Sequence, residues 1–256
     1  MNILPVKYQY TPNFTSYKRD VMNESPNMFT SIISHRNDTM VYRNDISWNK
    51  LHEFITNKYK NTPKVNVYNY ACSDGSEAYS LAIDIIHRTE NQEDAEKFFP
   101  IIAKDFDPVP LDDAKSHKIL LDDIDKKIIE HRSNGNFNKY FKNIGRKTYN
   151  INKYNGVYYH IKPELADKIQ FSRANILEDV KNIKPDNSIV MCRNCWPYLS
   201  SMERKALAQK LYNQLDTSSV VMLGEYDEKA SNAFSIMLDT GFTLINRDLR
   251  IFAKPE

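Results

Sequence analysis

The spacing of apolar positions in the N-terminal half changes from helical to strand-like and back. After Trp48, Leu51, Phe54 and Ile55 recur at helical spacing, and Thr62-Pro63 ends that helix. Two strand–loop–helix units follow, whose strands are rich in β-formers and whose helices have one apolar stripe: strands over 65–71 and 100–107, and helices over 76–88 and 111–120. Two consecutive units of this kind predict an α/β fold with a mostly parallel sheet.

The same alternation returns in the C-terminal half. It predicts strands over 169–171, 188–192 and 219–224, and helices over 203–215 and 230–238. The last two strands, 242–246 and 249–253, are joined closely around Arg247-Asp248, which predicts an antiparallel hairpin that closes the sheet.

Residues 1–36 have many Tyr, Asn, Ser and Pro and no sustained periodicity, so we expect a loosely structured arm or a few short helices there. The chain therefore divides into an N-terminal arm and helical segment, 1–62, and a main domain, 63–256.

Residues from about 121 to 163 break the pattern and predict a small inserted subdomain. Between His131 and Pro163 there is no Asp or Glu, and seven basic residues are interleaved with Phe and Tyr: Arg132, Lys139, Lys142, Arg146, Lys147, Lys153 and Lys162. Because such residues create a local positive field, we predict that this insert is a partner-docking surface. The alternative is a solvated basic face whose aromatic side chains pack inward.

Composition narrows the class of protein. With 256 residues, 27% of them charged and 41% hydrophobic, the chain suits one soluble globular body, and its net charge of +2 makes nucleic acid an unlikely general partner. No stretch approaches the roughly 20 apolar residues of a membrane span, and the polar N-terminus lacks a signal-peptide pattern. We expect a cytoplasmic protein without membrane insertion, and its three cysteines, which cannot pair evenly, suit a reducing compartment.

Polar residues follow three of the predicted strands, at the edge where open α/β sheets bind ligands. The first group, 72–77, has one glycine, Gly75, and is not the glycine-rich loop of dinucleotide sites. The second is Asp105-Phe-Asp107. Asp107-Pro108 suits a helix N-cap, so Asp105 is the better candidate to bind a ribose diol.

The third group, 192–198, allows several interpretations. A metal or redox site at Cys192-x-x-Cys195 would need further ligands, which only Cys72 and scattered histidines could supply, so we favour buried strand-end cysteines and no metal. Asn194-Cys-Trp-Pro-Tyr198 is similar to the Asn-Pro-Pro-Tyr signature of amino-group methyltransferases that act on DNA or glutamine. The segment is one residue longer and lacks one proline, so the similarity is poor and a nucleic-acid substrate stays a minority interpretation.

Taken together, five motifs in the same order resemble the CheR family, the S-adenosylmethionine-dependent methyltransferases of chemoreceptor glutamates. They are Asn37-Asp-Thr39-Met-Val-Tyr-Arg43, Cys72-Ser-Asp-Gly75-Ser-Glu77-Ala-Tyr79-Ser80, Asp105-Phe-Asp107, Asn175-Ile176 and Cys192-Arg193-Asn194-Cys-Trp-Pro-Tyr198-Leu199. The resemblance departs from the family pattern at Asp74, Ala78 and Leu199, and only 36 residues precede Asn37, where the family usually has a helical domain. These departures bear on the substrate more than on the cofactor.

The resemblance implies a Rossmann-like class I methyltransferase sheet, S-adenosyl-L-methionine as the cofactor, and a set of residues around it: Asn37, Thr39, Arg43, Cys72, Gly75, Glu77, Asp105, Asn175, Ile176, Arg193 and Asn194. It places Arg43 and Tyr198 closest to methyl transfer. The activity it implies is methylation of glutamate side chains in a chemoreceptor-like protein. It also makes a protein substrate with acidic side chains the expected partner of the basic insert, 131–163. A glutamate is already ionised near pH 7 and needs no general base, and Arg43 could hold it in a fixed orientation.

Two other functions stay open at this stage. One is a regulatory module that binds the cofactor without turnover, which the presence of Arg43 and Tyr198 disfavours. The other is a methyltransferase for nucleic acid or a small molecule.

Overall fold

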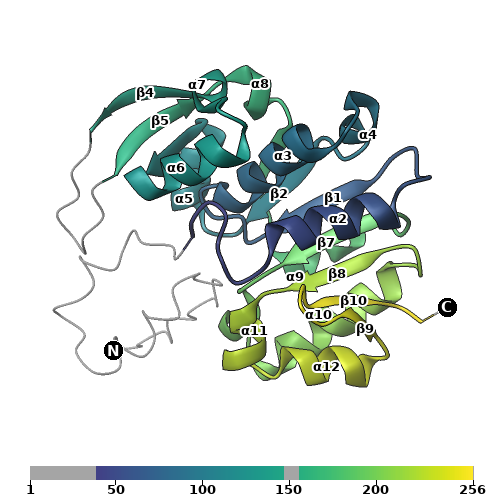
Figure 1. The fold of residues 1–256 in the computed structure, drawn as a ribbon. Helices are drawn as coiled ribbons and strands as arrows, with labels where there is room; N and C mark the ends of the chain where they lie inside the picture. Colours follow the sequence, from purple (N-terminus) through teal and green to yellow (C-terminus); the bar gives the residue numbers. More distant parts are fainter. Residues whose placement is uncertain (1–38, 147–155, 256) are drawn as a thin grey trace, which may run out of the picture.

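A seven-stranded sheet forms the centre of the main domain in the computed structural model, which describes residues 39–146 and 156–255. The strand order is β6-β2-β1-β7-β8-β10-β9 (Figure 1). The strands are β1 (Asn66–Tyr70), β2 (Ile101–Asp105), β6 (Ile169–Arg173), β7 (Ser188–Cys192), β8 (Val220–Leu223), β9 (Thr243–Asn246) and β10 (Ile251–Ala253). All neighbours pair in parallel except β10 with β8 and with β9. The expected α/β fold with an antiparallel C-terminal hairpin is confirmed.

Helices cover both faces of this sheet, because alternate residues of each strand point to opposite sides. Val67 and Met191 lie in one hydrophobic cluster, and Tyr68 and Val190 lie in the other. The helices of the first face are α2 (Trp48–Lys58), α3 (Ser76–Arg88) and α5 (Pro108–Lys115). Those of the second face are α9 (Ile176–Asp179), α10 (Ser201–Gln214) and α12 (Ala233–Thr240). The short helices α4 (Gln92–Glu96) and α11 (Glu225–Ala230) complete the domain.

Two predicted helices were wrong in extent. The helix expected over 111–120 ends at Lys115, since His117 takes a left-handed turn (φ 53°) and Lys118–Leu121 form a strand, β3. The helix expected over 230–238 is split between α11 and α12. It breaks at Ser231, whose backbone is extended and whose hydroxyl accepts from the N–H of Ala233 (3.2 Å).

The inserted segment folds around its own three-stranded antiparallel sheet, of order β3-β5-β4. Its other elements are β4 (Phe141–Arg146), β5 (Val157–Ile161), α6 (Asp123–Arg132), α7 (Phe137–Tyr140) and α8 (Pro163–Ala166). The rings of Phe137, Phe141 and Tyr159 pack on one another, with centroids 4.7 and 5.1 Å from that of Phe137. The insert's buried aromatic side chains therefore face inward, as the alternative interpretation expected, while Lys139 and Lys142 are exposed.

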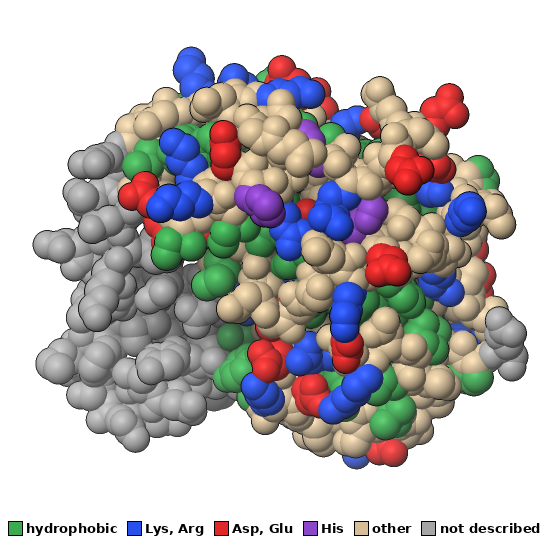
Figure 2. Space-filling model, viewed as in Figure 1, with side chains coloured by type: hydrophobic (Ala, Val, Ile, Leu, Met, Phe, Trp, Pro, Cys, Tyr) green, Lys and Arg blue, Asp and Glu red, His purple; other side chains and the backbone are tan. Residues whose placement is uncertain are grey.

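One of the seven basic residues of the insert turns toward the main domain, because Arg132 pairs with Asp84 of α3 at 3.3 Å. The side chain of Arg146, and Lys147 and Lys153, lie outside the described part of the chain. On the face drawn in Figure 2, Lys and Arg side chains lie among Asp and Glu side chains, so the charge of this face is mixed. Among the described helices, none is long and apolar enough to cross a lipid bilayer.

Candidate active site

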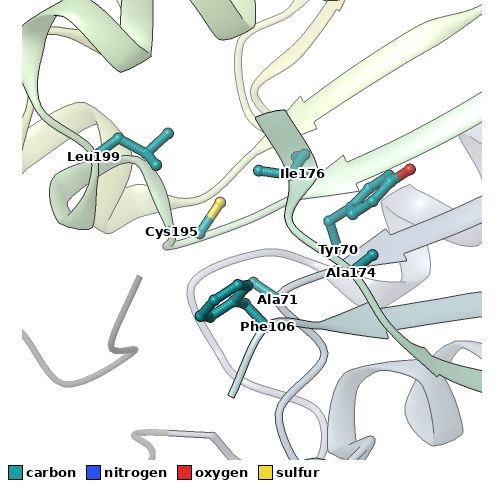
Figure 3. Close-up of a pocket in the computed structure, with 7 residues that line it drawn as sticks. All are labelled: Tyr70, Ala71, Phe106, Ala174, Ile176, Cys195 and Leu199. Carbon is teal, nitrogen blue, oxygen red and sulfur yellow. The ribbon is translucent and has the colours of Figure 1, made fainter. Parts of the chain in front are cut away.

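The carboxyl ends of neighbouring parallel strands surround a small pocket. Its lining comes from the ends of β1 and β2, from the segment after β6 and from the loop after β7 (Figure 3): Tyr70, Ala71, Phe106, Ala174, Ile176, Cys195 and Leu199. Ligands of open α/β sheets bind at this edge. The lining is mostly apolar and includes the ring of Phe106, so its chemistry suits contact with a flat and uncharged ring such as a nucleobase.

Asp105, the last residue of β2, is buried next to this pocket. Its Oδ2 accepts a hydrogen bond from the N–H of Ser73 (2.7 Å), and its Oδ1 accepts one from the N–H of Asp107 (2.8 Å). Burial raises the pKa of Asp105 to about 7, although these N–H donors favour the carboxylate. Each oxygen has a second lone pair, so Asp105 can still accept from a hydroxyl. Asp107 instead caps α5, as the sequence indicated, because it accepts from the N–H of Val109 (3.0 Å).

Left-handed residues shape the loop between β1 and α3. Ala71, Ser73 and Gly75 have φ values of 60°, 53° and 88°. A Cβ at Gly75 would lie 2.7 Å from Cζ of Phe171, so the position requires glycine. Strained non-glycine residues cost on the order of 1–3 kcal/mol each and gather at functional sites. Cys72 is buried in the core, whereas the buried hydroxyl of Ser73 has no partner among the described residues and is available to a ligand.

Asp74, at which the chain departs from the family pattern, has a local structural role. Its Oδ1 accepts from the N–H (2.9 Å) and the hydroxyl (2.7 Å) of Ser76, which satisfies a free N–H of the first turn of α3. Burial raises the pKa of Asp74, and the nearby charge of Arg43 acts in the opposite direction.

A buried arginine lies between two carboxylates at the centre of the site. The side chain of Arg193 is 0% exposed, and its two terminal nitrogens donate to Glu77 and to Asp45. The other oxygen of Glu77 accepts from Nδ2 of Asn69 (2.7 Å), whose own side-chain oxygen is buried without a partner in the described part of the chain. Burial opposes the charge of Arg193, but Glu77 and Asp45 outweigh it and raise its pKa. Glu77 and Arg193 are therefore brought together as an ion pair.

Asn194, the next residue, is held in a left-handed conformation (φ 57°). Its Nδ2 donates to Asp45 (3.2 Å), and its Oδ1 accepts from the N–H of Tyr226 (2.9 Å). A Cβ at Gly224 would lie 2.1 Å from that Oδ1, so the close approach of the two loops requires glycine at 224.

Asp227, which no sequence motif indicated, holds the same loop through hydrogen bonds to its backbone. Its carboxylate accepts from the N–H groups of Asn194 (2.6 Å), Gly224 (2.7 Å) and Trp196 (2.9 Å). Burial raises its pKa to about 7 against the effect of these donors. An acidic residue shortly after a strand-end glycine is the only signal that the sequence offers for this role.

The predicted pair Asn175 and Ile176 begins α9. Asn175 caps that helix by accepting from the N–H of Leu177 (3.0 Å), and Ile176 lines the pocket. Thr39 is half-buried at the start of the described chain, and Asn37 lies outside the described residues.

The two residues predicted to lie nearest the reaction approach the site from different segments. Arg43 is half-buried. Burial acts to raise the pKa of Asp45, but the charge of Arg193, the hydrogen bond from Asn194 and the charge of Arg43 together lower it. Its carbonyl accepts from Nε1 of Trp48 (3.0 Å), which anchors the segment before α2. Tyr198 is buried in the short helical turn Trp196–Tyr198, between the pocket residues Cys195 and Leu199.

The three cysteines are buried and free, as we favoured, and burial raises the pKa of each thiol. Within residues 39–146 and 156–255, no group of three or more His, Cys, Asp and Glu side chains is arranged to hold a metal ion.

The residues present fit the three parts of S-adenosylmethionine. The apolar pocket suits the adenine ring, Asp105 beside it can accept from the ribose hydroxyls, and the half-buried carboxylate of Glu77 can accept from the ammonium group. The unpartnered Ser73 hydroxyl lies on the loop between them.

Three solved structures are among those to which this chain is similar. A TehB-like SAM-dependent methyltransferase from Corynebacterium glutamicum is 10% identical, with a TM-score of 0.40, over 81% of this chain and 94% of that one. An O-methyltransferase family protein from Burkholderia thailandensis is 9% identical, with a TM-score of 0.43, over 81% and 56%. Magnesium protoporphyrin IX methyltransferase from Synechocystis, with bound SAM, is 12% identical, with a TM-score of 0.40, over 81% and 77%.

A family model provides the decisive comparison. The model of the CheR methyltransferase SAM-binding domain matches residues 37–238, which include all five motifs. The match confirms the resemblance drawn from those motifs and the cofactor that it implied. The chain belongs to the CheR methyltransferase family and is an S-adenosylmethionine-dependent methyltransferase.

Proposed function

We propose that this methyltransferase acts on side-chain carboxylates of a protein and forms methyl esters of glutamate. The observation that supports this acceptor is Arg43, which is half-buried in the segment before α2 and whose positive charge acts on Asp45 and on Asp74, the latter in the loop after β1. A planar, permanently charged guanidinium at this position suits a carboxylate acceptor, because it can bind both oxygens at once.

The cofactor supplies an electrophilic methyl group on a positively charged sulfur. The apolar pocket, Asp105 and Glu77 would hold its adenine, ribose and ammonium groups. The pocket is lined from four strand ends, Asp105 is the last residue of β2 and Glu77 lies in the first turn of α3, so the fold would set the orientation of the reactive methyl group.

The protein has to align an ionised carboxylate with that methyl group and exclude water from it. Opposite charges are neutralised in this step, so water would stabilise the separated reactants. Arg43 would orient the acceptor oxygens, and the buried Tyr198 would shape the path of the methyl group or donate to the acceptor. No proton needs to be removed, because a glutamate is ionised near neutral pH.

The insert is the docking surface that we propose for the protein substrate. Its exposed Lys139 and Lys142 suit acidic side chains on the partner, and its buried aromatic rings form a rigid base for them. A chemoreceptor-like partner, a role in chemotaxis and a cytoplasmic location belong to the same proposal.

Labelling of cell extract tests which molecule accepts the methyl group. Purified protein and S-adenosylmethionine with an isotopically labelled methyl group are added to extract, and the labelled molecules are identified by mass spectrometry. The proposal expects label on a protein and its release by mild base, because esters hydrolyse readily. Label that resists base, or that appears on nucleic acid or on a small molecule, would contradict it.

A further inference from the structure

We propose that Asp45 is a positioning residue for the cofactor, which acts through Arg193 to keep Glu77 available to the ammonium group. This inference rests on the role of Glu77 proposed above. Asp45 lies outside the five motifs, between Arg43 and the start of α2.

Asp45 ties together segments that are distant in the sequence. Its Oδ1 accepts from Arg193, and its Oδ2 accepts from Nδ2 of Asn194 (3.2 Å) and from the N–H of Glu225 (3.4 Å). Its backbone carbonyl accepts from Nη1 of Arg250 (3.0 Å). The segment before α2, the loop after β7, the start of α11 and the turn before β10 therefore meet at one residue, whose side chain is only 8% exposed.

The ionised form of Asp45 is the stable one in this environment. Burial acts to raise its pKa, but the charge of Arg193 and the amide of Asn194 outweigh burial, so the pKa lies below its usual value. The charge of Arg43 acts in the same direction.

The role proposed for Asp45 follows from the way the two terminal nitrogens of Arg193 are divided between two carboxylates. Asp45 and Glu77 each accept from one terminal nitrogen of Arg193, so Glu77 is paired with the guanidinium through one of its oxygens only. Without the carboxylate of Asp45, the second nitrogen of Arg193 would be free to pair with Glu77 as a bidentate fork. Glu77 would then have less capacity to accept from the ammonium group.

A double-mutant cycle tests the proposal, with calorimetry of S-adenosylmethionine binding to the full chain. Glu77→Gln and Asp45→Asn are each expected to raise the Kd about tenfold, since each weakens the contact between residue 77 and the ammonium group. The double variant is expected to be no more than about threefold weaker than either single variant, because Asp45 acts through Glu77. The control is Asp248→Asn, which removes a carboxylate paired with Lys50 at the surface and should leave the Kd unchanged.

Three results would overturn the proposal, and they point to different errors. An unchanged Kd in Glu77→Gln would refute the proposed cofactor role of Glu77 and, with it, this inference. A loss in Glu77→Gln without a loss in Asp45→Asn would refute Asp45 alone. A Kd about a hundredfold higher in the double variant would mean that Asp45 affects binding independently of Glu77, as a general structural residue would. Asp45→Ser, whose hydroxyl can still accept from Asn194, serves the same cycle if Asp45→Asn does not fold.

Discussion

The carboxylate of Asp227 accepts a hydrogen bond from the backbone N–H of Asn194 at 2.6 Å, across the ends of two neighbouring strands. This contact fixes Asn194 in its left-handed conformation, and with it the adjacent Arg193. The geometry of the charged centre therefore depends on a residue that makes no contact with Glu77 in the described interactions.

Asp227→Ala should destabilise the protein strongly. The change leaves the N–H groups of Asn194, Gly224 and Trp196 buried without their acceptor, and the loss is expected to be about 2–4 kcal/mol in the free energy of unfolding. Urea unfolding measures it. Asp239→Ala, at an exposed position of α12, is the matched control and should change stability by less than about 0.5 kcal/mol. Equal stability of the two variants would contradict the role of Asp227.

The pH dependence of cofactor binding should reveal Asp105. Its pKa is raised to about 7 by burial, so the carboxyl is largely protonated below that pH. Ribose hydroxyls donate to the ionised form of Asp105. Below pH 7, binding of the cofactor therefore has to displace the proton from this carboxyl group. Affinity for S-adenosylmethionine is therefore expected to rise by up to about tenfold per pH unit below pH 7 and to level off above it.

Calorimetry between about pH 5.5 and pH 7.5 measures this slope. Asp105→Asn is the control, because it keeps the shape of the side chain but cannot ionise. It should bind more weakly, by about 1–3 kcal/mol, and with a flat pH profile. A slope that persists in Asp105→Asn would assign the titration to another group.

The sequence predicted the elements with the strongest local patterns. The helix Ser76–Arg88 and the strand Ser188–Cys192 were predicted with exact bounds, because an apolar stripe in one and a continuous apolar run in the other leave no competing period. The strand Lys118–Leu121 was missed because it follows a helix after a two-residue turn, and its four residues are too few to show alternation.

The residues of the candidate site also fall into those that the sequence indicated and those that it did not. Asp105 was predicted because it follows a strand, where the fold class places ligands, and Glu77 and Arg193 because they belong to motifs that resemble the CheR family. Asp45 and Asp227 were missed, since their partners Arg193 and Asn194 are 148 and 33 residues away in the sequence. Only the packing of the loops brings these residues together.

Charge reversal on the insert tests the docking proposal. In Lys139→Glu combined with Lys142→Glu, two exposed cations become anions, so the KM for a protein acceptor should rise several-fold and lose much of its salt dependence. Cofactor affinity should not change, because the insert has a sheet of its own. Lys115→Glu combined with Lys181→Glu, at exposed positions outside the insert, is the control. Unchanged acceptor kinetics across a salt series would exclude this docking surface.

Arg43 and Tyr198 should affect turnover more than cofactor affinity, because their proposed contacts are with the acceptor and the transferring methyl group. Loss of a charge-assisted contact in Arg43→Ala is expected to cost about 1.5–3 kcal/mol in transition-state stabilisation, or roughly 10- to 100-fold in kcat/KM, and Tyr198→Phe about tenfold. Steady-state kinetics on the labelled acceptor and calorimetry of cofactor binding separate the two effects.

Arg43→Lys distinguishes charge from geometry: it keeps the positive charge but loses the planar fork, so it should recover only part of the activity. Arg88→Ala, which removes an exposed arginine at the end of α3, should behave like the unchanged protein. Full activity in both Arg43→Ala and Tyr198→Phe would place methyl transfer elsewhere. An equal loss of cofactor affinity and turnover would instead assign both residues to cofactor binding.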